Sequence, residues 1–113
     1  MKQYTTTEQT AKLIELGFDK PKNAQYVQRA KARNLHSPFI EFGEPEFEGS
    51  YSIGELLSFL PEFVNWTPRV IRGNVIEYSF ETEGSELYYC NAHNELIDNL
   101  YDMILRLKDE GVI

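Results

Sequence analysis

Apolar residues recur at helical spacing in three segments of the chain. Thr5 and Glu8 have the spacing of a capping box at the start of the first segment, and Ser52 and Glu55 have it in the second. The third segment, NELIDNLYDMILRLKDEG, has the longest apolar stripe, and Asn94 is placed to cap it. The expected helices cover about 6–16, 53–60 and 94–110.

Alternation of apolar and polar residues indicates strands in the second half of the chain. It runs through VIEYSFE, residues 75–81, and is typical of a strand with one buried and one solvated face. EGSE turns the chain, and LYYCNA returns with Tyr88 and Cys90 on the same face. The expected strands are a hairpin of about 70–82 and 87–92 and a further strand near 38–42.

The segment between the first two helices has a weaker pattern. Residues 23–34, NAQYVQRAKARN, have a narrow apolar side that is compatible with a helix, and residues 43–50, GEPEFEGS, predict a loop. The whole pattern predicts the α+β class, with a small antiparallel sheet covered on one face by three helices. No repeat or linker divides the 113 residues, so we expect a single domain over 1–113.

Composition narrows the function classes. The chain has 18 acidic and 11 basic residues and a formal charge of −7, and such a field repels nucleic acid. One cysteine cannot form an internal disulfide. The N-terminal residues lack a signal-peptide pattern, and no apolar stretch approaches the roughly 20 residues that span a bilayer. We therefore expect an acidic cytoplasmic protein that does not contact membranes.

Charge is segregated along the chain. Residues 20–40 contain five cations and no acid, whereas residues 41–48, EFGEPEFE, contain four glutamates and no base. The basic block could track a phosphate backbone while Tyr26 stacks on a base. The favoured alternative is a solvated segment that balances the acidic run, or that meets an acidic protein such as the EFGEPEFE segment of a second copy.

Cys90 and His93, in YYCNAHN, are the candidates for metal or nucleophilic chemistry. A structural zinc site needs four ligands, and this spacing supplies two; His36 is the other histidine of the chain. A nucleophilic Cys90 needs exposure and a lowered pKa, whereas the strand pattern turns its side chain to the face of Tyr88. The pattern therefore favours packing, and we predict no catalytic, cofactor-binding or metal-binding residue.

The positions of the carboxylates do not indicate catalysis, and those of several aromatic residues indicate a surface that contacts a partner. Glu77 and Glu81 lie on the solvated strand face, and no phosphate-binding or common hydrolase motif is present. Phe59, Phe63 and Trp66 flank the end of the second helix, and exposed aromatic residues beside charge are typical of partner surfaces. The candidate interaction surface consists of Lys20, Lys22, Tyr26, Arg29, Lys31, Arg33 and Trp66.

Two resemblances add expectations. YSIGEL, residues 51–56, resembles the opening of the helix-turn-helix in mercury-resistance-type transcription regulators, and TPRVIR, residues 67–72, is similar to the start of their recognition helix. The order of TxEQTAKLIELGF, the YSIGELLSFLP helix, an aromatic hairpin and NELIDNLYDMILRLKDEGVI resembles small uncharacterised proteins carried on phages and mobile elements of gut bacteria. That family has no assigned activity, so it implies a context and no site residues.

Three functional hypotheses follow. The leading one is a non-enzymatic cytoplasmic domain, without cofactors, that binds a protein partner or associates with itself. The alternative is a nucleic-acid-binding accessory protein of a phage or mobile element, which uses the basic block or the helix beginning at Ile53. The third is an enzyme or metal protein centred on Cys90 and His93.

Overall fold

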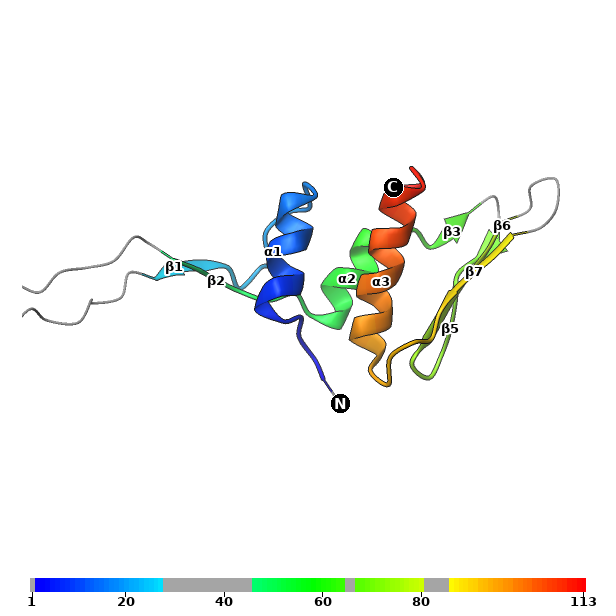
Figure 1. Cartoon of the computed structure of the whole chain (residues 1–113), viewed down its shortest axis with the longest axis horizontal. Coiled ribbons are helices and arrows are strands. Elements are labelled where there is room, and N and C mark those ends of the chain that lie inside the picture. The colour runs from blue at the N-terminus through cyan, green and yellow to red at the C-terminus, as the bar shows by residue number, and fades with distance from the viewer. Residues whose placement is uncertain (1, 28–45, 65–66, 81–85) are drawn as a thin grey trace, which may run out of the picture.

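The computed structural model describes residues 2–27, 46–64, 67–80 and 86–113, and Figure 1 shows how their helices and strands are arranged. The helices are α1 (Thr7–Glu15), α2 (Ile53–Phe59) and α3 (Leu96–Asp109). The strands are β1 (Gln25–Val27), β2 (Glu46–Glu48), β3 (Phe63–Val64), β4 (Thr67–Pro68), β5 (Val70–Arg72), β6 (Val75–Phe80) and β7 (Glu86–Cys90). All three predicted helices are confirmed, and none of the described helices is long and apolar enough to cross a membrane.

Both short helices begin at a capping box. The predicted pair of Ser52 and Glu55 at α2 is confirmed. At α1 the predicted pair was wrong by one residue, because Thr6 is the N-cap and exchanges hydrogen bonds with Gln9 over 2.9 and 3.1 Å. Thr5 is buried instead, and its hydroxyl accepts the Tyr51 N–H at 2.9 Å. The start of α1 is thereby tied to the residue before the N-cap of α2.

A buried asparagine organises the start of α3. The predicted cap at Asn94 was wrong, because the N-cap is Glu95, which makes no side-chain capping bond. Asn99, in the first turns of α3, is fully buried and accepts the His93 N–H at 3.1 Å. Its amide nitrogen donates to the carbonyl oxygens of Asn74 and His93. One side chain therefore joins the turn after β5, the connection after β7 and α3.

The central sheet is antiparallel in the order β5-β6-β7. The predicted strand over 70–82 is two strands, because the chain turns at Gly73, whose φ of 60° lies in the left-handed region that glycine tolerates. The returning strand, β7, is confirmed. A two-stranded pair of β3 and β4 leads into β5, with Phe63 opposite Pro68.

Several local expectations were wrong. Residues 67–72 form β4 and β5, so the recognition helix implied by the transcription-regulator resemblance is not present there. Residues 25–27, in the segment whose weak pattern is compatible with a helix, form β1, and residues 46–48, expected in a loop, form β2 opposite it. The strand expected near 38–42 lies outside the described residues.

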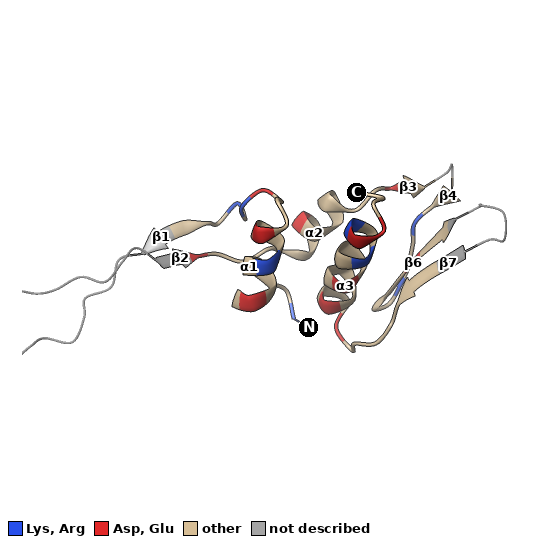
Figure 2. Cartoon of the chain, turned by 45° about the horizontal axis from the view of Figure 1, so that its top comes forward, with Lys and Arg blue, Asp and Glu red and all other residues tan. Residues whose placement is uncertain are grey.

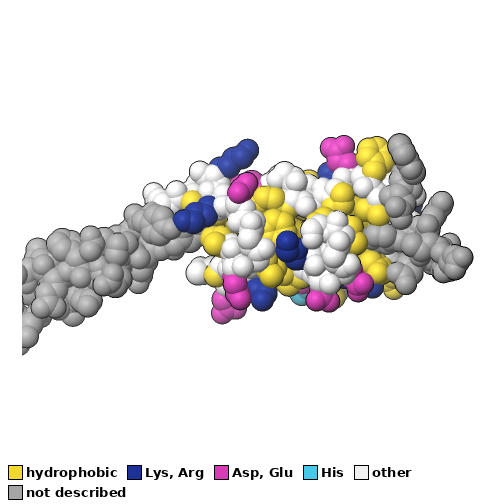
Figure 3. Space-filling view, turned by 90° about the horizontal axis from the view of Figure 1, so that it is seen from above, with side chains coloured by type: hydrophobic (Ala, Val, Ile, Leu, Met, Phe, Trp, Pro, Cys, Tyr) yellow, Lys and Arg dark blue, Asp and Glu magenta, His cyan; other side chains and the backbone are white. Residues whose placement is uncertain are grey.

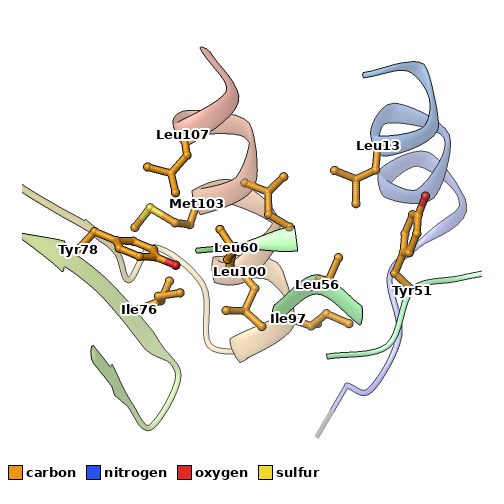
Figure 4. Packing of buried hydrophobic residues seen from close by; sticks show 11 residues of the cluster. Leu13, Tyr51, Leu56, Leu60, Ile76, Tyr78, Ile97, Leu100, Met103 and Leu107 are labelled. Carbon is orange, nitrogen blue, oxygen red and sulfur yellow. The ribbon is translucent and has the colours of Figure 1, made fainter. Parts of the chain in front are cut away.

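The core lies on both sides of α3. Figures 1 and 2 show α3 between the central sheet on one side and α1 and α2 on the other, and Figure 4 shows Met103 directed towards Tyr78. The buried hydrophobic core consists of eleven described residues: Leu13, Tyr51, Leu56, Leu60, Ile76, Tyr78, Ile97, Leu100, Met103, Ile104 and Leu107. The predicted α+β class is therefore confirmed.

Candidate functional site

Cys90 lies at the end of β7 and packs against the core, on the same sheet face as Tyr88. Burial is the largest influence on its thiol and raises the pKa, the charge of Asp102 raises it further, and Arg106 partly opposes both. A thiol with a raised pKa is mostly protonated at neutral pH and is a poor nucleophile. This environment is that of a packing residue.

The His93 ring points to a carboxylate. Its Nε2 lies 2.7 Å from Oδ2 of Asp102 in an exposed pair. Among the described residues, no group of three or more His, Cys, Asp and Glu side chains gathers where a metal ion could bind. Within the described residues, His93 is thus engaged with Asp102, and Cys90 is packed against the core.

The predicted basic surface falls largely outside the described residues, which exclude Arg29, Lys31, Arg33 and Trp66. Tyr26 belongs to β1 through its backbone. Lys20 and Lys22 border a hollow of about 290 Å³, and the Lys22 backbone N–H donates to Glu55 at 3.0 Å. Its remaining lining residues are Asp19, Glu55, Ser58 and Phe59. Charges of both signs thus surround this hollow.

The central sheet and the β3–β4 pair have a second face that the helices do not cover. Paired residues share a face, and neighbours along a strand alternate between faces. The register sets Val70, Glu77 and Tyr89 in one row, opposite to the face of Ile76 and Tyr78. We call this second face the outer face, and its described members on the central sheet are Val70, Arg72, Val75, Glu77, Ser79 and Tyr89. We include with it Phe63 and Pro68, which pair with each other in the adjoining β3–β4 strands, because Val64 on the opposite face of that pair packs against the core.

The outer face is apolar and accessible. Phe63 is 60% exposed and Tyr89 is 50% exposed. Leaving these side chains in water is unfavourable, because aromatic residues have a large apolar surface. Five of the eight members are apolar, and Arg72 and Glu77 supply one charge of each sign. In Figure 1 no described element lies on this side of the sheet. An apolar surface with few charges is suited to contact with protein.

The sequence held part of this information. Alternation along β6 and β7 separates Tyr89 from Tyr78, so exposure of one strand face was predictable. Phe63 could not be assigned because β3 and β4 have two residues each, too few for a periodic signal.

No protein family model, no curated protein and no solved structure matches this chain.

Proposed function

We propose that this protein is a non-enzymatic interaction module that binds protein through the outer face, with a second copy of the chain as its partner. The observation that supports the proposal is the outer face itself, where Phe63 and Tyr89 are exposed, while Ile76 and Tyr78 on the inner face of the central sheet are buried. Burying Phe63 and Tyr89 against another protein removes their apolar surface from water, which is favourable by about 25 cal/mol per Å².

Charge favours a second copy as the occupant. Arg72 on β5 and Glu77 on β6 lie in neighbouring rows of the outer face, because Arg72 pairs with Val75 and Glu77 pairs with Val70. When two copies meet about a two-fold axis, the arginine of each can face the glutamate of the other, and both charges are paired. Eight residues are fewer than the 20–30 per side of a standard interface, so we expect weak association with a Kd above about 1 µM.

Sedimentation velocity tests the proposal directly. Between about 10 µM and about 1 mM, the weight-average sedimentation coefficient should rise from the monomer value towards the dimer value. Replacing both aromatic residues, F63S and Y89S, should abolish the rise. Tyr4→Ser is the matched control, because Tyr4 is also 50% exposed and lies outside the outer face. A monomer at all concentrations would contradict self-association, and an equal loss in the control would contradict the outer face as the surface through which the copies associate.

Charge reversal provides a sharper version of the experiment. Arg72→Glu alone and Glu77→Arg alone should each weaken association, because each places two like-charged pairs across the two-fold axis. An equimolar mixture of the two variants should restore dimers, because both pairs are then complementary. If the mixture dimerises no better than either variant alone, the proposed pairing is wrong.

A further inference from the structure

A groove of about 590 Å³ opens between the C-terminal halves of α1 and α3. Its volume is within the 300–1,000 Å³ typical of ligand sites. The groove is lined by Lys12, Leu16, Leu105, Arg106, Lys108 and Asp109. Figure 2 shows blue segments on both helices, and Figure 3, which looks onto this end of the molecule, shows basic side chains beside hydrophobic ones.

The three cations of the groove lack carboxylate partners in the described part of the chain. The ion pairs closer than 4.0 Å there are Lys2 with Asp98 and His93 with Asp102. The chain has 18 acidic residues for 11 basic ones, so cations could readily have been neutralised within the molecule. Their convergence around one groove leaves a local positive charge in a strongly negative protein.

Aromatic rings restrain two of these cations. The guanidinium carbon of Arg106 lies 4.1 Å from the centroid of the Tyr88 ring, and Nζ of Lys108 lies 5.6 Å from that of Phe18. A side chain held over a ring loses less conformational entropy when it binds a ligand. The groove is therefore partly preorganised for an anion.

The negative C-terminal ends of α1 and α3 neutralise only part of the positive charge of the groove side chains. Each helix C-terminus has about half a negative charge, so the ends of α1 and α3 together contribute about −1. Lys12, Arg106 and Lys108 against Asp109 give +2 among the lining side chains, which leaves about +1. The exposed carboxylates of Glu15 and Glu110 do not line the groove.

We propose that this groove binds an acidic peptide segment that carries a large apolar side chain. Carboxylates of the peptide pair with the three cations, and the apolar side chain lies against Leu16 and Leu105. A nucleic acid fits less well, because Leu16 and Leu105 offer no partner to a sugar-phosphate backbone, whereas they can contact an apolar side chain of a peptide. The site lies between α1 and α3, and its Arg106 side chain reaches the Tyr88 ring of β7. None of its lining residues belongs to the outer face, so it is independent of self-association there.

The chain itself supplies a suitable probe. Residues 41–48, EFGEPEFE, combine four glutamates with two phenylalanines and contain no base. We expect a fluorescently labelled peptide of this sequence to bind the full chain at low salt with a Kd on the order of 100 µM, measured by fluorescence anisotropy. Lys12→Glu and Arg106→Glu should each weaken binding at least about tenfold. Lys12 is exposed, so its variant remains informative if Arg106→Glu loses the Tyr88 contact and unfolds.

Matched controls separate the groove from other basic positions. Lys22→Glu makes the same charge change at the hollow beside Glu55 and should leave the Kd unchanged. A peptide with all four glutamates replaced by glutamine should not bind. The proposal is overturned by absence of saturation up to about 1 mM, by equal binding of the glutamine peptide, by an effect of K22E as large as that of K12E, or by tighter binding of single-stranded DNA that depends on Lys12.

Discussion

On its sheet side, α3 meets a dry and closed surface, where Met103 lies beside Tyr78 and Ile76 is fully buried (Figure 4). On its α1 side, the contacts are polar near the N-terminus, where Lys2 and Gln9 reach Asp98 over 2.7 and 2.9 Å. Towards the C-terminus the same side opens into the groove. The closed interface accounts for stability, because it excludes water from apolar surface, whereas the open one leaves room for a ligand.

Two nearby positions on α3, Met103 and Leu105, allow the two sides of the helix to be tested separately. Met103 is fully buried on the sheet side, whereas Leu105 is partly exposed and lines the groove. Met103→Ala should lower the free energy of unfolding by about 2–5 kcal/mol, because it leaves a cavity. Leu105→Ala should cost about 1 kcal/mol, because water can fill the space. Urea unfolding of both variants measures the difference, and equal losses would mean that the groove side is as closed as the sheet side.

Loss of the Asn99 hydrogen bonds, which join α3 to the turn after β5, should have the next largest effect on stability. Asn99→Ala removes the acceptor of the His93 N–H and one donor to the Asn74 carbonyl oxygen, both at a fully buried side chain. Leaving such groups unpaired costs about 1–3 kcal/mol. Asn74→Ala is the control, because its side chain makes one exposed bond to the His93 carbonyl oxygen and should cost less than about 1 kcal/mol.

Hydrogen exchange shows where the Asn99 effect acts. In Asn99→Ala, amides of β5, β6 and β7 should lose more protection than those of α1, because Asn99 joins the hairpin turn to α3. Uniform loss across the chain would show that the asparagine stabilises the whole fold equally and does not specifically fasten the sheet to α3.

Sequence periodicity predicted the positions of the helices, whereas tertiary contacts determined the N-cap of α1 and the burial of Asn99. The apolar stripes located all three helices because each buries one face. Thr5 and Thr6 are followed three residues later by Glu8 and Gln9, so both pairs fit a capping box, and the buried contact of Thr5 with Tyr51 decided between them. Sequence gave no sign that Asn99 would be buried.

The groove was equally invisible in the sequence. Lys12 and Arg106 are 94 positions apart, and only the packing of α1 beside α3 brings them to one groove. The charge segregation in residues 20–48 instead predicted an interaction surface in the basic block, most of which lies outside the described residues. The interaction surface expected there stays a prediction.

The smallest expected effect concerns the polar end of the α1 side, and it depends on pH. Desolvation, the largest single influence on Asp98, raises its pKa, but hydrogen bonds from Lys2 and Gln9 and the charge of Lys2 together outweigh it and lower the pKa below its ordinary value. A carboxylate with a lowered folded-state pKa adds stability above its unfolded pKa of about 3.9, and that stability is lost as the pH falls through the folded value.

Asp98→Asn should therefore destabilise the protein by about 1 kcal/mol at pH 7, and the difference from the native chain should shrink as the pH is lowered from 7 to below the unfolded value of about 3.9. Unfolding free energies of both chains between these pH values give the result. Lys2→Met should reduce the pH dependence in the native background and change little in the Asp98→Asn background, because the partner is already neutral. A difference that stays constant with pH would show that Asp98 acts through packing or neutral hydrogen bonds, and that the charge of Lys2 does not help to hold the α1 side against α3.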